Sequence, residues 1–129
     1  MPATQSPAEV LADGFVSYLF DEYRGTRHVR RVASWIGFII KAVERLPGVS
    51  FNRRHSRQLG FEYRGRKFKA RYNHRAGARG GIDIVEVLPG RGAPEGKVAA
   101  SIISLSDAED VYASLRKLLD RFISRTPSP

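Results

Sequence analysis

The stretch that decides the fold is SFNRRHSRQLGFEYRGRKFKARYNHR, residues 50–75. Apolar side chains occupy every second position on both sides of Arg64-Gly65: Leu59, Phe61 and Tyr63 before it, and Phe68, Ala70 and Tyr72 after it. A period of two residues is typical of β-strands, because successive side chains point to opposite faces of a sheet. The stretch therefore predicts a β-hairpin that turns at Arg64-Gly65 and has one apolar face.

The polar face of this predicted hairpin is basic. Lys67, Lys69 and Arg71 share it at intervals of about 6.5 to 7 Å, and Arg75 extends the series. These intervals are close to the phosphate repeat along a nucleic-acid strand. The hairpin is therefore the first candidate for a binding surface.

Two further strands are expected after the hairpin, and each follows a glycine-rich loop. Residues 74–81 form the first loop, because closely spaced glycines do not sustain a strand. Residues 82–88 then predict a strand that is apolar on both faces apart from Asp83 and Glu86, which favours a central position in the sheet. After a second loop at 89–96, residues 97–105 predict the fourth strand.

Helices are expected on both sides of the sheet-forming region. Ser6-Pro7-Ala8-Glu9 has the spacing of a capping box and predicts a helix over residues 7–23. Thr26 can cap a second helix, which Leu46-Pro47-Gly48 ends and whose apolar residues include Trp35 and Phe38, both assigned to the core. A second capping box at residues 106–109, led by Ser106, opens the last helix.

This order of elements predicts an α+β fold: two N-terminal helices, an antiparallel sheet of three to four strands and one C-terminal helix. The helices should cover one face of the sheet in a two-layer sandwich and leave the basic face in water. We assign residues 7–124 to a single domain, and residues 1–6 and 125–129 to flexible tails.

Composition excludes several classes of protein. The chain has no cysteine, which excludes disulfides, thiol catalysis and thiolate zinc sites. Its most apolar stretch, residues 32–43, is too short to span a bilayer and contains Lys41. With no secretory signal visible at the N-terminus, the expected location is the cytoplasm.

Positive charge is concentrated in the middle of the chain. The formal charge is +9, yet residues 24–79 hold sixteen Lys or Arg against Glu44 and Glu62, a local excess of +14. Such asymmetry indicates an anionic partner. A solvated basic surface is the competing interpretation, since 17 of the 22 basic residues are Arg, a bias that genomic base composition can produce.

Three functions fit this pattern, and the leading one is binding of DNA or RNA through the phosphate backbone. The alternatives are an interaction module that docks an acidic protein and a metal-free ribonuclease or toxin-like enzyme using His55 or His74. The predicted nucleic-acid contacts lie in the hairpin, the loop after it and the first turn of the second helix. They are Arg27, Arg30, Arg31, Arg64, Arg66, Lys67, Lys69, Arg71, His74, Arg75 and Arg79.

No metal or cofactor is predicted. Asp83 and Glu86 are three residues apart, so on a strand they point to opposite faces and do not share one cation. We expect them instead to pair with Lys69 or Arg71 across the sheet. The glycines at 77–81 lack the Gly-Lys-Ser/Thr ending of a P-loop, which argues against nucleotide hydrolysis.

Overall fold

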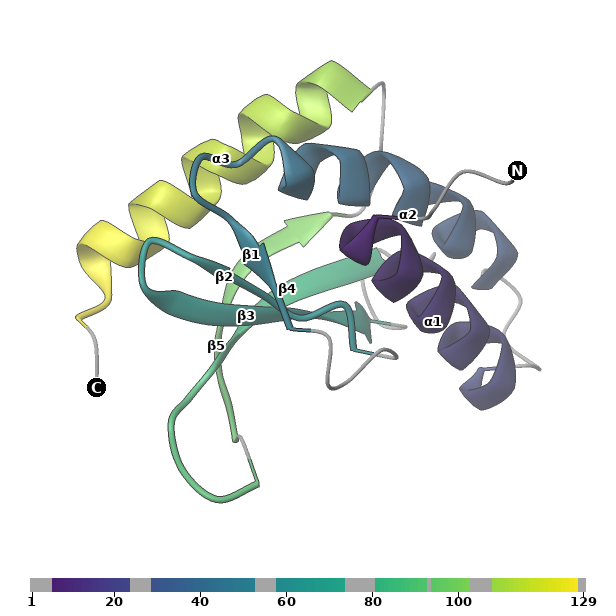
Figure 1. Cartoon of the computed structure of the whole chain (residues 1–129), viewed down its shortest axis with the longest axis horizontal. Helices are drawn as coiled ribbons and strands as arrows, with labels where there is room; N and C mark the ends of the chain where they lie inside the picture. Colours follow the sequence, from purple (N-terminus) through teal and green to yellow (C-terminus); the bar gives the residue numbers. More distant parts are fainter. Residues whose placement is uncertain are drawn as a thin grey trace.

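The chain folds into a layer of helices packed on one antiparallel sheet (Figure 1). The computed structural model describes residues 6–23, 29–52, 58–73, 81–92, 94–102 and 108–127. Three helices and five strands lie in this part of the chain. They are α1 (Pro7–Glu22), α2 (Val29–Glu44), β1 (Ser50–Phe51), β2 (Phe61–Tyr63), β3 (Arg66–Asn73), β4 (Gly81–Val87), β5 (Glu95–Ile102) and α3 (Ala108–Arg125).

The strands are ordered in the sheet as they are in the chain, and every neighbouring pair is antiparallel. The predicted hairpin is confirmed: β2 and β3 pair with Tyr63 opposite Arg66. Its two turn residues, Arg64 and Gly65, have φ values of 52° and 78°, the backbone of the tight turn that matches the twist of a hairpin. The fifth strand, β1, was not predicted, because two residues are too short to show an alternating pattern.

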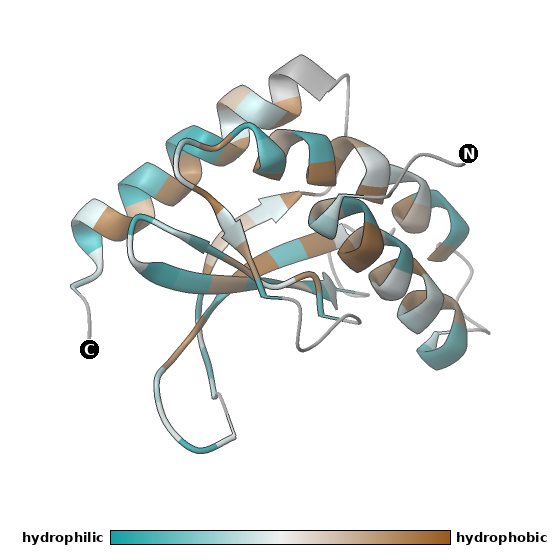
Figure 2. Cartoon of the chain, viewed as in Figure 1, coloured by the Kyte–Doolittle hydropathy of each residue, from teal (hydrophilic) through white to brown (hydrophobic). Residues whose placement is uncertain are grey.

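The two faces of the sheet differ as the alternation predicted. Phe61, Tyr63, Phe68, Ala70 and Tyr72 are buried in one core with the apolar sides of the helices (Figure 2). We call the opposite surface of the sheet the outer face. The central position expected for residues 82–88 is confirmed, since β4 lies between β3 and β5 and is buried from position 81 to 86.

Helix α1 begins where the sequence indicated, and the Ser6 hydroxyl accepts a hydrogen bond from the Glu9 amide at 3.2 Å. Helix α2 packs against both α1 and α3, so it is the middle helix of its layer. Trp35 is buried as predicted, but the assignment of Phe38 to the core is wrong, because its side chain is 45% exposed. Phe38 lies outside the buried arc of α2.

The ends of several elements lie outside the described residues, among them the predicted caps Thr26 and Ser106. The C-terminal boundary differs from the prediction, because α3 extends to Arg125 and the Thr126 amide still bonds to the Phe122 carbonyl at 2.8 Å. Among the helices that the structure describes, none combines the length and apolarity needed to cross a membrane.

Candidate nucleic-acid interface

The predicted contact residues are divided between two sides of the molecule. Arg27, His74, Arg75 and Arg79 lie outside the described residues. The remaining seven are placed, and they do not form one surface. Lys67, Lys69 and Arg71 are on the outer face of the sheet, whereas Arg30 and Arg31 are on α2, which packs on the opposite, apolar face.

On the outer face, the basic row of β3 is present but largely paired with carboxylates. The Lys69 amine lies 3.0 Å from Glu95, and Arg71 contacts Glu95 at 2.7 Å and Asp83 at 3.2 Å. Lys67 is exposed and stands opposite Glu62 of β2 in the strand register. Lys69 and Arg71 are therefore paired with acids, whereas Lys67 stands opposite Glu62 without an ion pair among the described residues. Three acids lie beside or opposite three cations, so the net formal charge along β3 is close to zero.

Asp83 is held firmly at the centre of this network. Besides Arg71, it accepts hydrogen bonds from Asn73 at 3.1 Å and from the Ser101 hydroxyl at 2.8 Å. The expected pairing of Asp83 with Arg71 is thus confirmed. Hydrogen bonds from Lys69 and then Arg71 outweigh burial and lower the pKa of Glu95, which keeps its negative charge beside both cations.

Arg66 does not belong to this row, and its assignment as a phosphate contact is wrong. Its side chain is 6% exposed and forms two hydrogen bonds with the equally buried Glu86, at 2.6 and 2.8 Å. The guanidinium also donates to the Thr126 carbonyl and lies 5.2 Å from the centre of the Phe122 ring. Arg66 therefore joins the sheet to the end of α3 inside the core. Glu86 pairs here rather than with Lys69 or Arg71.

Arg64 lies in the hairpin turn and also contacts α3. Its guanidinium is 3.2 Å from Asp120, and that carboxylate accepts a 2.6 Å hydrogen bond from the Tyr63 hydroxyl. Burial and this hydrogen bond raise the pKa of Tyr63. On the next turn of α3, Arg116 donates to the Tyr112 hydroxyl at 3.0 Å. The Arg64 side chain is half exposed, and a guanidinium has five N–H groups, so some of them can still donate to another acceptor.

The exposed side of α2 carries cations that the sequence prediction missed. Lys41, and Arg45 directly after the end of α2, join Arg30 and Arg31 within about 100° of the helix circumference, and the exposed Phe38 lies in the same arc. We call these five residues the α2 basic face. A helical-wheel projection would have found it, whereas the prediction considered only the first turn.

Aromatic rings support two of the arginines of the α2 basic face. The Arg31 guanidinium lies 4.9 Å from the centre of the Trp35 ring, and that of Arg45 lies 4.0 Å from the centre of Tyr112 in α3. Stacking of this kind orients a guanidinium without neutralising its charge. No carboxylate lies within ion-pair distance of Arg30, Lys41 or Arg45 in the part of the chain that the structure describes.

Asp83 and Glu86 do not form a shared metal site in the described part of the chain. Asp83 and Glu86 point to opposite faces of β4, where each pairs with an arginine. Within the described residues, no three His, Cys, Asp or Glu side chains lie close enough together to hold a metal ion. His55 and His74, the residues behind the ribonuclease hypothesis, lie outside those residues.

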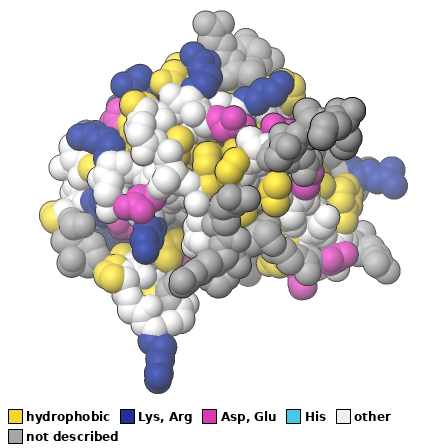
Figure 3. Space-filling view, in the orientation of Figure 1, with side chains coloured by type: hydrophobic (Ala, Val, Ile, Leu, Met, Phe, Trp, Pro, Cys, Tyr) yellow, Lys and Arg dark blue, Asp and Glu magenta, His cyan; other side chains and the backbone are white. Residues whose placement is uncertain are grey.

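Acidic and basic side chains are interspersed on the surface that Figure 3 shows, rather than separated into large patches of one sign. Comparisons with known proteins find no counterpart: no family model matches the chain, and neither a curated protein nor a solved structure matches it significantly. Function is therefore inferred from the side chains alone.

Proposed function

We propose that the chain binds nucleic acid, mainly through the phosphate backbone, and that the α2 basic face makes the principal contacts. The observation that carries this proposal is the difference between the two basic surfaces. In the outer row of β3, two of the three cations, Lys69 and Arg71, are paired with carboxylates. On the α2 basic face, Arg30, Lys41 and Arg45 are all exposed and have no acidic partner among the described residues. Phosphates replace water around unpaired cations more readily than they displace a carboxylate from an existing ion pair.

The dimensions of the α2 basic face suit a nucleic-acid strand. Arg30 and Arg45 are fifteen residues apart, which corresponds to about 22 Å along a helix. A duplex strand of that length carries about six phosphates. The only acidic residue of α2, Glu44, lies about 40° outside the arc of the basic face.

Phe38 adds a contact that a purely electrostatic surface would lack. An exposed aromatic ring among cations is a platform on which an unpaired base can stack, with a contribution of about 1 to 3 kcal/mol per base. An acidic protein partner could bury the same ring, so this alternative is retained as an outcome of the test. Phe38 favours single-stranded over duplex ligands, because bases in a duplex are already stacked.

The test measures fluorescence anisotropy of labelled mixed-sequence single-stranded DNA, RNA and duplex DNA over a range of salt concentrations. Replacing Arg30, Lys41 and Arg45 together with Gln should reduce the slope of log affinity against log salt by about 2 units if all three contact phosphates. Phe38→Ala should weaken single-strand binding more than duplex binding.

Two matched variants distinguish a site from net charge. Lys97 of β5 and Lys117 and Arg121 of α3 are exposed cations outside the α2 basic face, and their triple Gln variant should bind nearly as the wild type does. The triple Gln variant of Lys67, Lys69 and Arg71 should lose less affinity than the α2 variant. If the β3 variant loses more, the α2 assignment is wrong. If the wild type binds none of the ligands at low salt, nucleic-acid binding is rejected and the acidic-protein alternative takes its place.

A further inference from the structure

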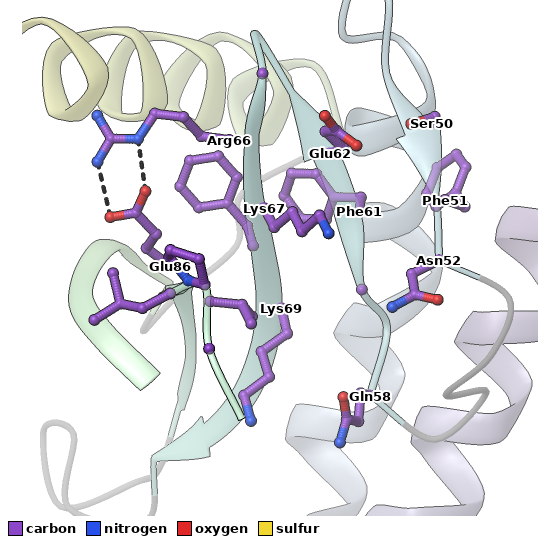
Figure 4. A pocket seen from close by; sticks show the side chains of 17 residues that line it. Ser50, Phe51, Asn52, Gln58, Phe61, Glu62, Arg66, Lys67, Lys69 and Glu86 are labelled. Carbon is purple, nitrogen blue, oxygen red and sulfur yellow. Dashed lines mark hydrogen bonds and ion pairs between the residues drawn. The ribbon is translucent and has the colours of Figure 1, made fainter. Parts of the chain in front are cut away.

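The outer face of the sheet contains a pocket that the proposed nucleic-acid contacts do not use (Figure 4). Its volume is about 660 Å³, and it is lined by residues of β1, β2 and β3, by residues between β1 and β2, and by the end of β4 with the chain that follows it. Known small-molecule sites have volumes of roughly 300 to 1,000 Å³. The pocket lies on the opposite side of the sheet from α2.

One wall of the pocket is cationic. Lys67 and Lys69 line it from β3, and their side chains point to the outer face. Lys69 is 3.0 Å from Glu95, but Lys67 is exposed and has no ion pair among the described residues. An anionic group entering the pocket would therefore meet Lys67 first and would share Lys69 with Glu95.

The other wall offers hydrogen-bonding groups of a different kind. Asn52 and Gln58 bring carboxamides into the pocket, and Glu62 of β2 brings a carboxylate (Figure 4). Carboxamides both donate and accept, so they can recognise the edge of a nucleobase. A carboxylate is an acceptor for the hydroxyl groups of a ribose.

The backbone between these groups keeps the pocket open. The Gly60 carbonyl accepts a hydrogen bond from the backbone N–H of Asn52 at 2.9 Å. A Cβ added at Gly60 would lie 3.4 Å from the Asn52 Cβ. A longer side chain there would fill the pocket beside Asn52. The preceding residue, Leu59, has a φ of 51°, a backbone conformation that costs a bulky residue energy. This turn places the Gln58 side chain at the pocket while Leu59 itself is buried in the core.

We propose that this outer-face pocket binds a nucleoside monophosphate, either free or as one residue of a single strand. Lys67, assisted by Lys69, holds the phosphate. Glu62 accepts from the ribose hydroxyls, and Asn52 and Gln58 contact the base edge. The lysines come from β3, whereas Asn52 directly follows β1 and Gln58 precedes β2, so a ligand must span the pocket to reach both groups.

Isothermal titration calorimetry with AMP, GMP, CMP and UMP tests this assignment, with the four nucleosides and inorganic phosphate as partial ligands. At least one monophosphate should bind more than tenfold tighter than either its nucleoside or phosphate alone, because only the complete ligand reaches both walls. Lys67→Gln should weaken its binding by about tenfold or more, since it removes a charge-assisted hydrogen bond. Lys69→Gln should have a smaller effect, because that lysine is shared with Glu95.

Gly60→Leu should abolish nucleotide binding by filling the pocket, and its thermal unfolding should be compared with that of the wild type. If this variant does not fold, Lys67→Gln still decides the question, with Lys97→Gln as the control of equal charge. Equal losses in Lys67→Gln and Lys97→Gln, or no binding of any monophosphate at millimolar concentration, would overturn the proposal.

The α2 triple variant should bind mononucleotides normally, so failure of the pocket is distinguishable from failure of the α2 basic face. Competition by an oligonucleotide carrying the preferred base would identify a strand as the source of the ligand.

Discussion

Arg66→Met should be among the most destabilising single substitutions in the chain. The Arg66 guanidinium forms two hydrogen bonds with Glu86, and both side chains are 6% exposed. Removing the arginine leaves a carboxylate in the core without its counter-charge and leaves the Thr126 carbonyl without this donor. Loss of one partner of a buried ion pair costs about 3 to 5 kcal/mol, against a total stability of about 5 to 15 kcal/mol for a domain.

The loss of stability in Arg66→Met should arise mainly from the buried, unpaired Glu86 carboxylate rather than from the lost hydrogen bonds themselves. The double variant Arg66→Met/Glu86→Leu should therefore recover most of the loss, because two apolar side chains of similar volume can replace a buried pair at little cost. Lys67→Met is the control at the next residue. Its side chain is exposed, so it should change the free energy of unfolding by about 0.5 kcal/mol or less.

Urea unfolding followed by the fluorescence of the single tryptophan, Trp35, measures these differences as shifts in midpoint at constant slope. Two results would refute the reasoning. One is a loss below about 1 kcal/mol for Arg66→Met, a value typical of exposed pairs. The other is a double variant no more stable than Arg66→Met alone, since the penalty would then not arise from Glu86.

Three further outcomes are expected. Ile36→Ala should lower the free energy of unfolding by about 2 to 5 kcal/mol, because Ile36 is 1% exposed in the middle helix; a change near zero would contradict that packing. Gly65→Ala should cost about 1 to 2 kcal/mol from its φ of 78° alone, since no atom crowds the added methyl group; an unchanged melting temperature would argue against the turn. The pKa of Glu95 is lowered, so its contribution to stability is present above about pH 4.5 and lost as the pH falls through the folded-state pKa. Stability of Glu95→Gln should thus fall less steeply in acid, and parallel pH profiles for variant and wild type would oppose this assignment.

The α+β class and the hairpin could be predicted because both depend on local periodicity. Alternation from Leu59 to Tyr72 defines an apolar face, and every apolar member of that series is buried. The same rule places Arg66 on the apolar face, because it precedes Phe68 by two residues. The prediction grouped Arg66 with Lys67 because the two residues are adjacent in the sequence. The alternation along the strand would have assigned Arg66 to the opposite face.

The pairing of the basic row could not be predicted, because it depends on contacts distant in sequence. Glu95 lies 24 residues after Arg71, at the start of β5, and it reaches the row through the β4–β5 register. That register contains two irregularities, between Ile84 and Val85 and between Val85 and Val87. Counting along the strands does not reveal such bulges. The neutrality of the outer face is therefore a property of the fold.

The agreement between strand order and chain order also bears on how the protein folds. Every pairing in the sheet joins successive strands, so each closes a short loop at a small cost in chain entropy. The most distant hydrogen bonds from the hairpin lead to α3, where Asp120 and Thr126 follow Tyr63 and Arg66 by 57 and 60 residues. We expect the sheet to form early and α3 to dock last. A chain still being synthesised would expose the part of the apolar face that α3 covers until residues 108–127 leave the ribosome, and during that interval it is most prone to aggregate.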